Sequence, residues 1–123
     1  MATTEIGKEL RKIRIDRDER LLDMANRLDK SAAFISAVET GRKSPPSGFE
    51  DLIIKAYRLV GEAADKIKKA ADRSRQAFTL EANTDLQRDT FGLMARRMNT
   101  LSDDDLNAIF SILNKDKGGK NDV

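Results

Sequence analysis

The side chains that most often carry out catalysis are absent from this sequence. Its 123 residues include no cysteine and no histidine, which excludes thiolate nucleophiles, disulfides and the commonest general base and metal ligand. The one cluster of carboxylates is Asp103–Asp105. Consecutive residues of a helix point in different directions, and a helix N-terminus favours acidic residues in any case. We therefore expect no catalytic residue, no metal site and no cofactor.

The stretch from residue 21 to residue 41 has a spacing that suits the binding of duplex DNA. A small residue, Ala25, precedes two branched apolar residues, Ile35 and Val38. In a helix-turn-helix, two short helices cross steeply and approach closely only where a small side chain lies at the crossing. The second helix needs an apolar face that holds it in place, so that its other face stays free for the major groove. The spacing therefore predicts a helix-turn-helix.

Further residues extend this pattern. Leu28 stands before the expected turn and Ser31 at the start of the second helix. The string that follows is Ile35-Ser36-x-Val38-Glu39-x-Gly41-Arg42-Lys43, with Pro45 just after it. Residues 6–60 thereby resemble the phage-repressor and Cro type of helix-turn-helix proteins, the Xre family. The resemblance implies a lambda-repressor-like domain of five helices that binds DNA with the second helix of the motif, the recognition helix.

The resemblance also implies which residues contact base edges. They lie on the outward face of the recognition helix and are Ser31, Ala32, Ala33, Ser36 and Ala37. Alanine methyl groups pack on thymine methyl groups, and serine bonds to several bases, whereas bidentate readers are absent from this face. Specificity would then depend on thymine contacts and DNA shape, or on polar readers from other segments. The alternative is that the three alanines are helix formers packed inside the monomer.

Phosphate contacts are expected from the polar side chains beside this helix. These candidates are Arg20, Lys30, Thr40, Arg42 and Lys43. Two positions depart from the family. Leu21 stands where the family often has a phosphate-contacting glutamine, and the neighbouring Arg20 is the substitute. Asp29 stands where the turn often has glycine, and aspartate can adopt the left-handed conformation that a turn requires. The alternative for the two loop cations is that they are solvated surface charges.

One further pair of residues has a structural role in the family. An arginine of the first helix commonly pairs with a glutamate of the recognition helix. Arg14 and Glu39 occupy these positions here. The resemblance therefore implies an ion pair that fixes the first helix to the recognition helix.

The composition favours a mainly α-helical protein with a modest, aliphatic core. Charged residues make up 36%, hydrophobic residues 39% and aromatic residues 5% of the chain, and the formal net charge is +2. Apolar residues recur at helical spacing in several segments. The sets on successive helices are Ile6, Leu10 and Ile13; Leu21, Met24, Ala25 and Leu28; Ile35 and Val38; and Leu52, Ile53, Ala56 and Leu59. No apolar stretch is long enough to span a membrane, and we expect a cytoplasmic protein.

Breaks and caps divide the chain. Adjacent Pro45 and Pro46 end a segment, and Ser47 with Glu50 has the spacing of a capping box that opens a new helix. Ser102 with Asp105 has the same spacing. We expect a helix-turn-helix domain over residues 1–61, a helical oligomerisation region over 62–115 and a flexible tail over 116–123.

The second region has too few apolar residues for a core of its own. Apolar residues that need cover are Phe78, Leu80, Phe91, Met94, Met98, Ile109, Phe110 and Leu113. A second copy of the chain is the economical cover, because twofold dimers are the commonest oligomers. The alternatives are that this region folds back on the first domain or receives another protein, such as a toxin. Because Phe78, Leu80 and Ala82 alternate with polar residues, one short strand is also predicted.

These features point to a sequence-specific, double-stranded DNA-binding regulator of transcription. The interpretation is a dimeric repressor that binds a palindromic operator, as phage regulators and autoregulating antitoxins do. The alternative is a protein-binding module on a helix-turn-helix scaffold, such as a toxin-neutralising antitoxin with little DNA binding. An enzyme is not expected.

Overall fold

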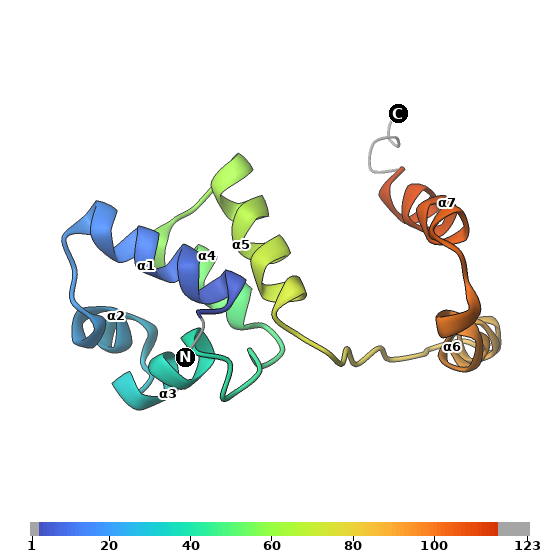
Figure 1. Ribbon diagram of the computed structural model, residues 1–123, viewed down its shortest axis with the longest axis horizontal. Coiled ribbons are helices and arrows are strands. Elements are labelled where there is room, and N and C mark those ends of the chain that lie inside the picture. The colour runs from blue at the N-terminus through green and yellow to red at the C-terminus, as the bar shows by residue number, and fades with distance from the viewer. Residues whose placement is uncertain (1–2, 116–123) are drawn as a thin grey trace. The chain divides into compact units, whose positions relative to one another are not determined.

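The computed structural model describes residues 3–115 and is mainly α-helical (Figure 1). The chain divides after Phe78 into two compact units, here called unit 1 and unit 2. The helices of unit 1 are α1 (Glu5–Arg17), α2 (Leu21–Leu28), α3 (Ala32–Glu39), α4 (Phe49–Tyr57) and α5 (Gly61–Arg73). Those of unit 2 are α6 (Asp85–Arg97), the short 3-10 helix η1 (Met98–Thr100) and α7 (Asp103–Asn114). Within residues 3–115, no helix is long and apolar enough to cross a membrane.

Unit 1 has one continuous hydrophobic core to which all five helices contribute. Its buried members are Ile6, Leu10, Met24, Ala25, Leu28, Ile35, Val38, Phe49, Ile53, Tyr57, Ile67, Ala70 and Ala71. The helical spacing of apolar residues predicted the contributions of α1, α2 and α3. It missed two aromatic members, Phe49 and Tyr57, which lie at the two ends of α4.

The first compact unit extends beyond residue 61, where the sequence predicts the end of the first domain. Helix α5 packs against α1 and α4, and its apolar residues Ile67 and Ala71 are almost completely buried there. The apolar stripe of a helix shows that one face needs cover, but it does not show which neighbour supplies the cover. The apolar stripe of α5 is covered within the first compact unit.

Two local predictions are wrong. Residues 78–82 form no strand, and residues 3–115 contain no other strand with which they could pair. A strand needs a neighbour for its backbone hydrogen bonds, so five alternating residues are not sufficient. The capping box at Ser47 is also absent: α4 begins after Gly48, which has a φ of +83° and provides no side-chain cap. The Glu50 carboxylate accepts instead from the Arg75 guanidinium.

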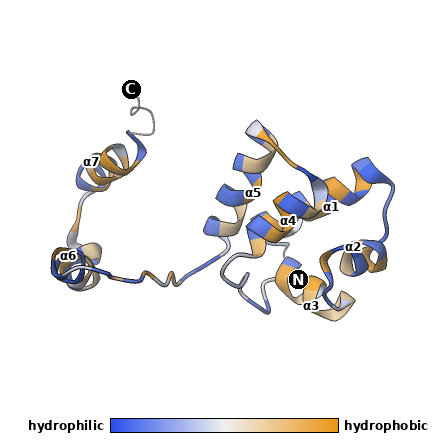
Figure 2. Cartoon of the chain, turned by 180° about the vertical axis from the view of Figure 1, so that it is seen from behind, coloured by the Kyte–Doolittle hydropathy of each residue, from blue (hydrophilic) through white to orange (hydrophobic). Residues whose placement is uncertain are grey.

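Unit 2 differs from unit 1 because none of its described residues is buried. Its helices are nevertheless well capped. The Thr84 side chain caps α6, and Ser102 and Asp105 form the predicted capping box of α7. Large apolar side chains remain exposed, among them Leu86, Phe110 and Leu113. Figure 2 shows hydrophobic residues on both helices of this unit. The predicted tail, residues 116–123, lies outside the described part of the chain.

Candidate nucleic-acid interface

Helices α2 and α3 are joined by a tight turn that begins at Asp29. This residue has the left-handed conformation, with a φ of 56° and a ψ of 44°. Aspartate thus adopts the conformation for which glycine is usual in such a turn. The amide of Asp29 donates to the carbonyl of Asn26 and that of Lys30 to the carbonyl of Ala25. These bonds satisfy the last carbonyls of α2. Ser31 then caps α3, since its hydroxyl accepts from the amide of Phe34 at 3.0 Å.

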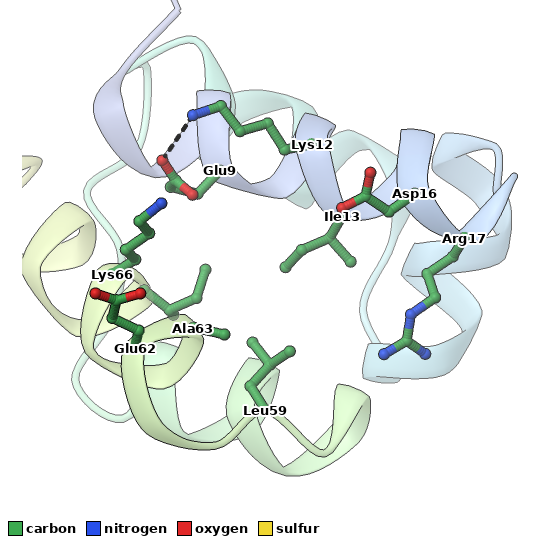
Figure 3. Close-up of a pocket in the computed structure, with 10 residues that line it drawn as sticks. Glu9, Lys12, Ile13, Asp16, Arg17, Leu59, Glu62, Ala63 and Lys66 are labelled. Atoms are coloured by element: carbon green, nitrogen blue, oxygen red, sulfur yellow. Dashed lines mark hydrogen bonds and ion pairs between the residues drawn. The ribbon is translucent and has the colours of Figure 1, made fainter.

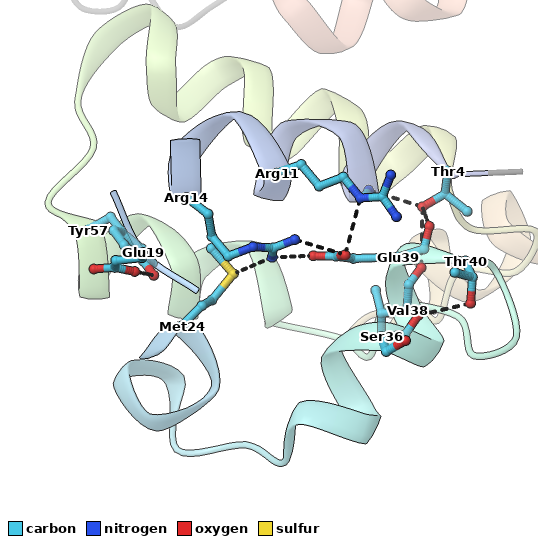
Figure 4. Close-up of polar contacts among 11 residues, drawn as sticks. Thr4, Arg11, Arg14, Glu19, Met24, Ser36, Val38, Glu39, Thr40 and Tyr57 are labelled. Atoms are coloured by element: carbon cyan, nitrogen blue, oxygen red, sulfur yellow. Dashed lines mark hydrogen bonds and ion pairs between the residues drawn. The ribbon is translucent and has the colours of Figure 1, made fainter. Parts of the chain in front are cut away.

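The inner face of α3 is held by apolar packing and by one buried carboxylate. Ile35 and Val38 are fully buried. The Glu39 carboxylate receives two bonds from the Arg14 guanidinium, at 2.5 and 3.2 Å, and lies 3.6 Å from Arg11 (Figure 4). The side chains of Arg14 and Glu39 are only 12% and 4% exposed. The ion pair between Arg14 of α1 and Glu39 of α3 is therefore present.

The start of α1 also contacts the end of α3 directly. The Thr4 amide donates to the Glu39 carbonyl at 2.9 Å, and the Thr4 hydroxyl lies 3.1 Å from the same oxygen. Gly7 is required at this contact, because a Cβ atom there would lie 2.5 Å from the Glu39 carbonyl oxygen. Together with the ion pair, these contacts fix the inner face of α3 along its last turn.

The outer face of α3 presents small side chains. Ser31 and Ala33 are exposed, and Ala32, Ser36 and Ala37 are half-buried. None of the five predicted base-reading residues is buried, so they are not part of the core. Ala32 is the least free of them, because it packs against the edge of the core.

Three cations surround this face without a carboxylate partner within residues 3–115: Lys30, Arg42 and Lys43. The Lys30 and Lys43 ammonium groups lie 5.5 and 5.9 Å from the centre of the same ring, that of Phe34. Phe34 in turn packs edge-on against Phe49, with ring centres 5.8 Å apart. The sequence did not single out Phe34, because one aromatic residue on a short helix is not distinguishable from a core residue.

The other two predicted phosphate ligands are engaged within the chain. Arg20 lies beside the Asp23 carboxylate at 3.4 Å, on an exposed part of the surface. The Thr40 hydroxyl donates to the Ser36 carbonyl at 2.9 Å and accepts from Arg42 at 3.2 Å. Leu21 is partly buried and packs against the core.

A polar network on the core's edge ties α2 to α4. The Tyr57 hydroxyl donates to Glu19 at 2.7 Å (Figure 4). Glu19 also accepts from Arg27. Burial and the bond to Glu19 raise the pKa of Tyr57 to about 12. Burial alone would raise the pKa of Glu19, but the bonds from Tyr57 and Arg27 outweigh it and hold that pKa below its ordinary value.

Other features of the surface offer no comparable site. A groove of about 360 Å³ lies between α1 and α5, with Ile13 and Leu59 at its base (Figure 3). Acidic and basic residues alternate around it, so it suits no strongly charged ligand. Asp103–Asp105 form the first turn of α7, and Asp105 caps that helix. No group of histidine, cysteine or acidic residues in the described part of the chain could hold a metal ion.

The predicted dimer residues are all exposed or half-buried. They are Phe78, Leu80, Phe91, Met94, Met98, Ile109, Phe110 and Leu113. Met94 and Ile109 line an apolar groove of about 270 Å³ between α6 and α7, together with Leu93, Leu101 and Arg97. Unit 2 therefore has an apolar surface that its own helices do not cover.

Comparison with protein-family models, with curated proteins and with solved structures finds no match to this chain. What the protein does is therefore inferred from its own residues and their placement.

Proposed function

We propose that this protein is a sequence-specific, double-stranded DNA-binding regulator of transcription, with a five-helix, Xre-like domain in unit 1. The observation that carries the proposal is the asymmetry of α3. Its inner face is fixed by Ile35, Val38 and Glu39, whereas its outer face presents small side chains to solvent. A helix that is held on one side and smooth on the other suits the major groove.

Small side chains allow close approach to base edges. The exposed methyl group of Ala33 would pack against thymine methyl groups, and the hydroxyl groups of Ser31 and Ser36 would bond to neighbouring bases. With few polar readers on this face, part of the specificity would come from the shape and deformability of the DNA.

The three unpaired cations would bind the phosphates that flank the groove. Lys30 lies in the turn before α3, and Arg42 and Lys43 lie in the loop after it. The ammonium groups of Lys30 and Lys43 nevertheless lie close together, because they are 5.5 and 5.9 Å from the centre of the Phe34 ring. Contacts with phosphates fix the register of the protein on the duplex without reading its sequence. Arg20, which lies beside Asp23, and Thr40 would contribute less.

Unit 2 would make the protein a dimer. Because none of its described residues is buried, a second copy that covers Phe110, Leu113 and the α6–α7 groove would supply the missing core. A twofold dimer presents two recognition helices to half-sites about 34 Å apart, one turn of DNA. The operator would then be palindromic, and occupation of a promoter by the dimer would repress transcription.

The apolar surface of unit 2 also supports a second candidate function. A protein partner, such as a toxin, could cover Leu86, Phe110 and Leu113 in place of a second copy. The protein would then neutralise its partner and bind DNA weakly.

Footprinting on the DNA upstream of the protein's own coding region tests the proposal. We expect protection of an inverted repeat, lost in Ala33→Glu, which places a negative charge on the outer face of α3. Ala63→Glu is the matched control, because it makes the same change at an exposed helical alanine of α5. Folded protein that protects no site, or equal footprints from Ala33→Glu and the wild type, would contradict the proposal.

A further inference from the structure

The chain just after α5 holds the loop that follows α3. Arg75 lies two residues beyond the end of α5, and its side chain is only 8% exposed. Its Nε donates to the Pro45 carbonyl at 3.0 Å and its Nη2 to the Pro46 carbonyl at 2.7 Å. The same guanidinium donates to both oxygens of Glu50, at 3.2 and 2.6 Å. One side chain thus binds two loop carbonyls and the first turn of α4.

The two prolines explain why a side chain is needed here. Proline has no backbone N–H, so Pro45 and Pro46 can be held by hydrogen bonds only through their carbonyls. Arg75 binds both. The backbone bonds nearest to them are from Lys43 to the Ala37 carbonyl and from Phe49 to the Pro46 carbonyl. Arg75 therefore supplies much of the hydrogen bonding of the loop.

The neighbouring residue anchors Arg75 to the rest of unit 1. The Ser74 hydroxyl donates to the Ala70 carbonyl at 2.8 Å and accepts from the Ile6 amide at 3.1 Å. Ser74 thereby ties the end of α5 to the start of α1, which itself contacts the end of α3. The loop is held from a rigid point, because these contacts join it to three helices.

Charge and shape both favour arginine at this position. The hydrogen bonds from Arg75 lower the pKa of Glu50 and keep its carboxylate ionised. A guanidinium presents a planar fork of donors that can reach two carbonyls and a carboxylate at once, whereas the lysine ammonium is a compact point charge. Lysine would preserve the charge but not the set of contacts.

We propose that Arg75 is a positioning residue for DNA binding: it fixes the α3–α4 loop, and so holds Arg42 and Lys43 where they meet the phosphates beside α3. This inference rests on the proposed function. A loop that is already ordered pays no further conformational cost on binding. Arg75 itself does not touch the DNA and acts through the loop.

Amide hydrogen exchange in the full-length protein tests the clamp without DNA. In Arg75→Gln we expect the Lys43 amide to exchange at least about tenfold faster, because its loop opens locally. Arg27→Gln is the matched control, since it removes the same charge from another ion pair of unit 1, with Glu19, and should leave the Lys43 amide unchanged. Urea unfolding followed by the fluorescence of Tyr57, the one tyrosine in a chain without tryptophan, monitors whether unit 1 stays folded. The presence of a cooperative transition is compared and not the fluorescence intensity, because Arg27 lies over the Tyr57 ring.

DNA affinity tests the positioning role. We expect Arg75→Gln to bind the operator about tenfold more weakly. Without the clamp, the loop would have to become ordered when the protein binds DNA, and this conformational cost lowers the affinity. Arg75→Lys should show most of this loss although it keeps the charge, and it serves if Arg75→Gln does not fold. Combined with Lys43→Ala, the losses should be less than additive, because both variants remove the same contact.

The outcomes are distinguishable. Unchanged exchange at Lys43 in Arg75→Gln overturns the clamp. The positioning role is overturned if Arg75→Gln loosens the loop but leaves the DNA affinity unchanged. It is also overturned if Arg75→Lys binds DNA as tightly as the wild type, or if the losses from Arg75→Gln and Lys43→Ala are strictly additive. Wild-type protein that binds no DNA while its loop is clamped overturns the proposed function instead, and with it the role of Arg75 in DNA binding.

Discussion

The longest helices of units 1 and 2 have 12 or 13 residues each, but the two units differ in how their helices are stabilised. In unit 1, five helices bury a continuous core and polar networks join α1 to α3 and α2 to α4. In unit 2, α6 and α7 have good caps, but none of their residues is buried. Caps and helix propensity alone stabilise helices of this length only marginally. Unit 1 therefore has a hydrophobic core of its own, whereas the described residues of unit 2 form none.

The largest expected effect compares one isoleucine in each unit. Ile53 is fully buried in α4, whereas Ile112 in α7 is 65% exposed. Ile53→Ala should lower the free energy of unfolding of unit 1 by about 2–5 kcal/mol, because it removes buried methyl groups and leaves a cavity. Ile112→Ala should change it by less than about 0.5 kcal/mol. Urea denaturation followed by Tyr57 fluorescence measures both values.

The same measurement can contradict the comparison. If Ile112→Ala destabilised unit 1 as much as Ile53→Ala, the two units would unfold as one and unit 2 would have its cover within the monomer. Sedimentation of Phe110→Ala sharpens this point. Phe110 is 66% exposed in α7, so its loss should weaken self-association and leave the unfolding of unit 1 unchanged.

A buried ion pair of unit 1 should matter more than an exposed pair of unit 2. Arg14→Gln leaves the buried Glu39 carboxylate with only Arg11 nearby and should cost about 3 kcal/mol, the lower end for a broken buried pair. The exposed pair of Arg88 and Asp85 is the control, and Arg88→Gln should cost less than about 1 kcal/mol of α6 stability. Equal small costs would show that the Arg14 contact does not fix α1 to α3.

The pH dependence of unit 1 should show the Tyr57 network. The folded pKa of Tyr57, about 12, lies above the ordinary value of 10.0, so its contribution is complete below pH 10 and is lost as the pH rises towards 12. Between pH 9 and pH 11.5, the free energy of unfolding should fall by about 2 kcal/mol more in the wild type than in Tyr57→Phe. Parallel pH profiles would contradict the raised pKa.

The smallest expected effects come from the serine caps. Ser31 caps α3 and Ser102 caps α7 with equivalent bonds, of 3.0 and 3.1 Å. Each change to alanine should cost about 1 kcal/mol of helix stability. Ser31→Ala should appear in the cooperative unfolding of unit 1, whereas Ser102→Ala should appear as a lower helix content of α7 in carbon chemical shifts. A cooperative loss in both would indicate that α7 packs on a core.

Local patterns in the sequence predicted those features of the fold that are set within a single helix. The apolar spacing predicted the buried faces of α1, α2 and α3, and the family resemblance implied the contact between Arg14 and Glu39. Features that depend on partners distant in the sequence were missed. The packing of α5 against α1 and α4 depends on neighbours that are distant in the sequence, and so does the irregular backbone at residues 78–82. The periodicity of a single segment does not identify such neighbours.

Arg75 is the clearest case of a missed residue. It follows the end of a charged helix, and its sequence neighbours give no sign that it binds carbonyls about thirty positions earlier. The adjacent prolines were the available signal, because their carbonyls have to find donors elsewhere. In the sequence, the same prolines indicate only a helix break, and the spacing of Ser47 and Glu50 predicts a capping box, whereas Glu50 accepts from Arg75 in the structure.

The salt dependence of DNA binding tests the central claim, that α3 and its flanking cations face duplex DNA, most directly. For the wild type, the logarithm of the association constant should fall linearly with the logarithm of salt concentration. Replacing both Arg42 and Lys43 with alanine should reduce the magnitude of that slope by about one to two units. Binding that does not respond to salt, or an unchanged slope in the double variant, would contradict the claim and favour a protein partner.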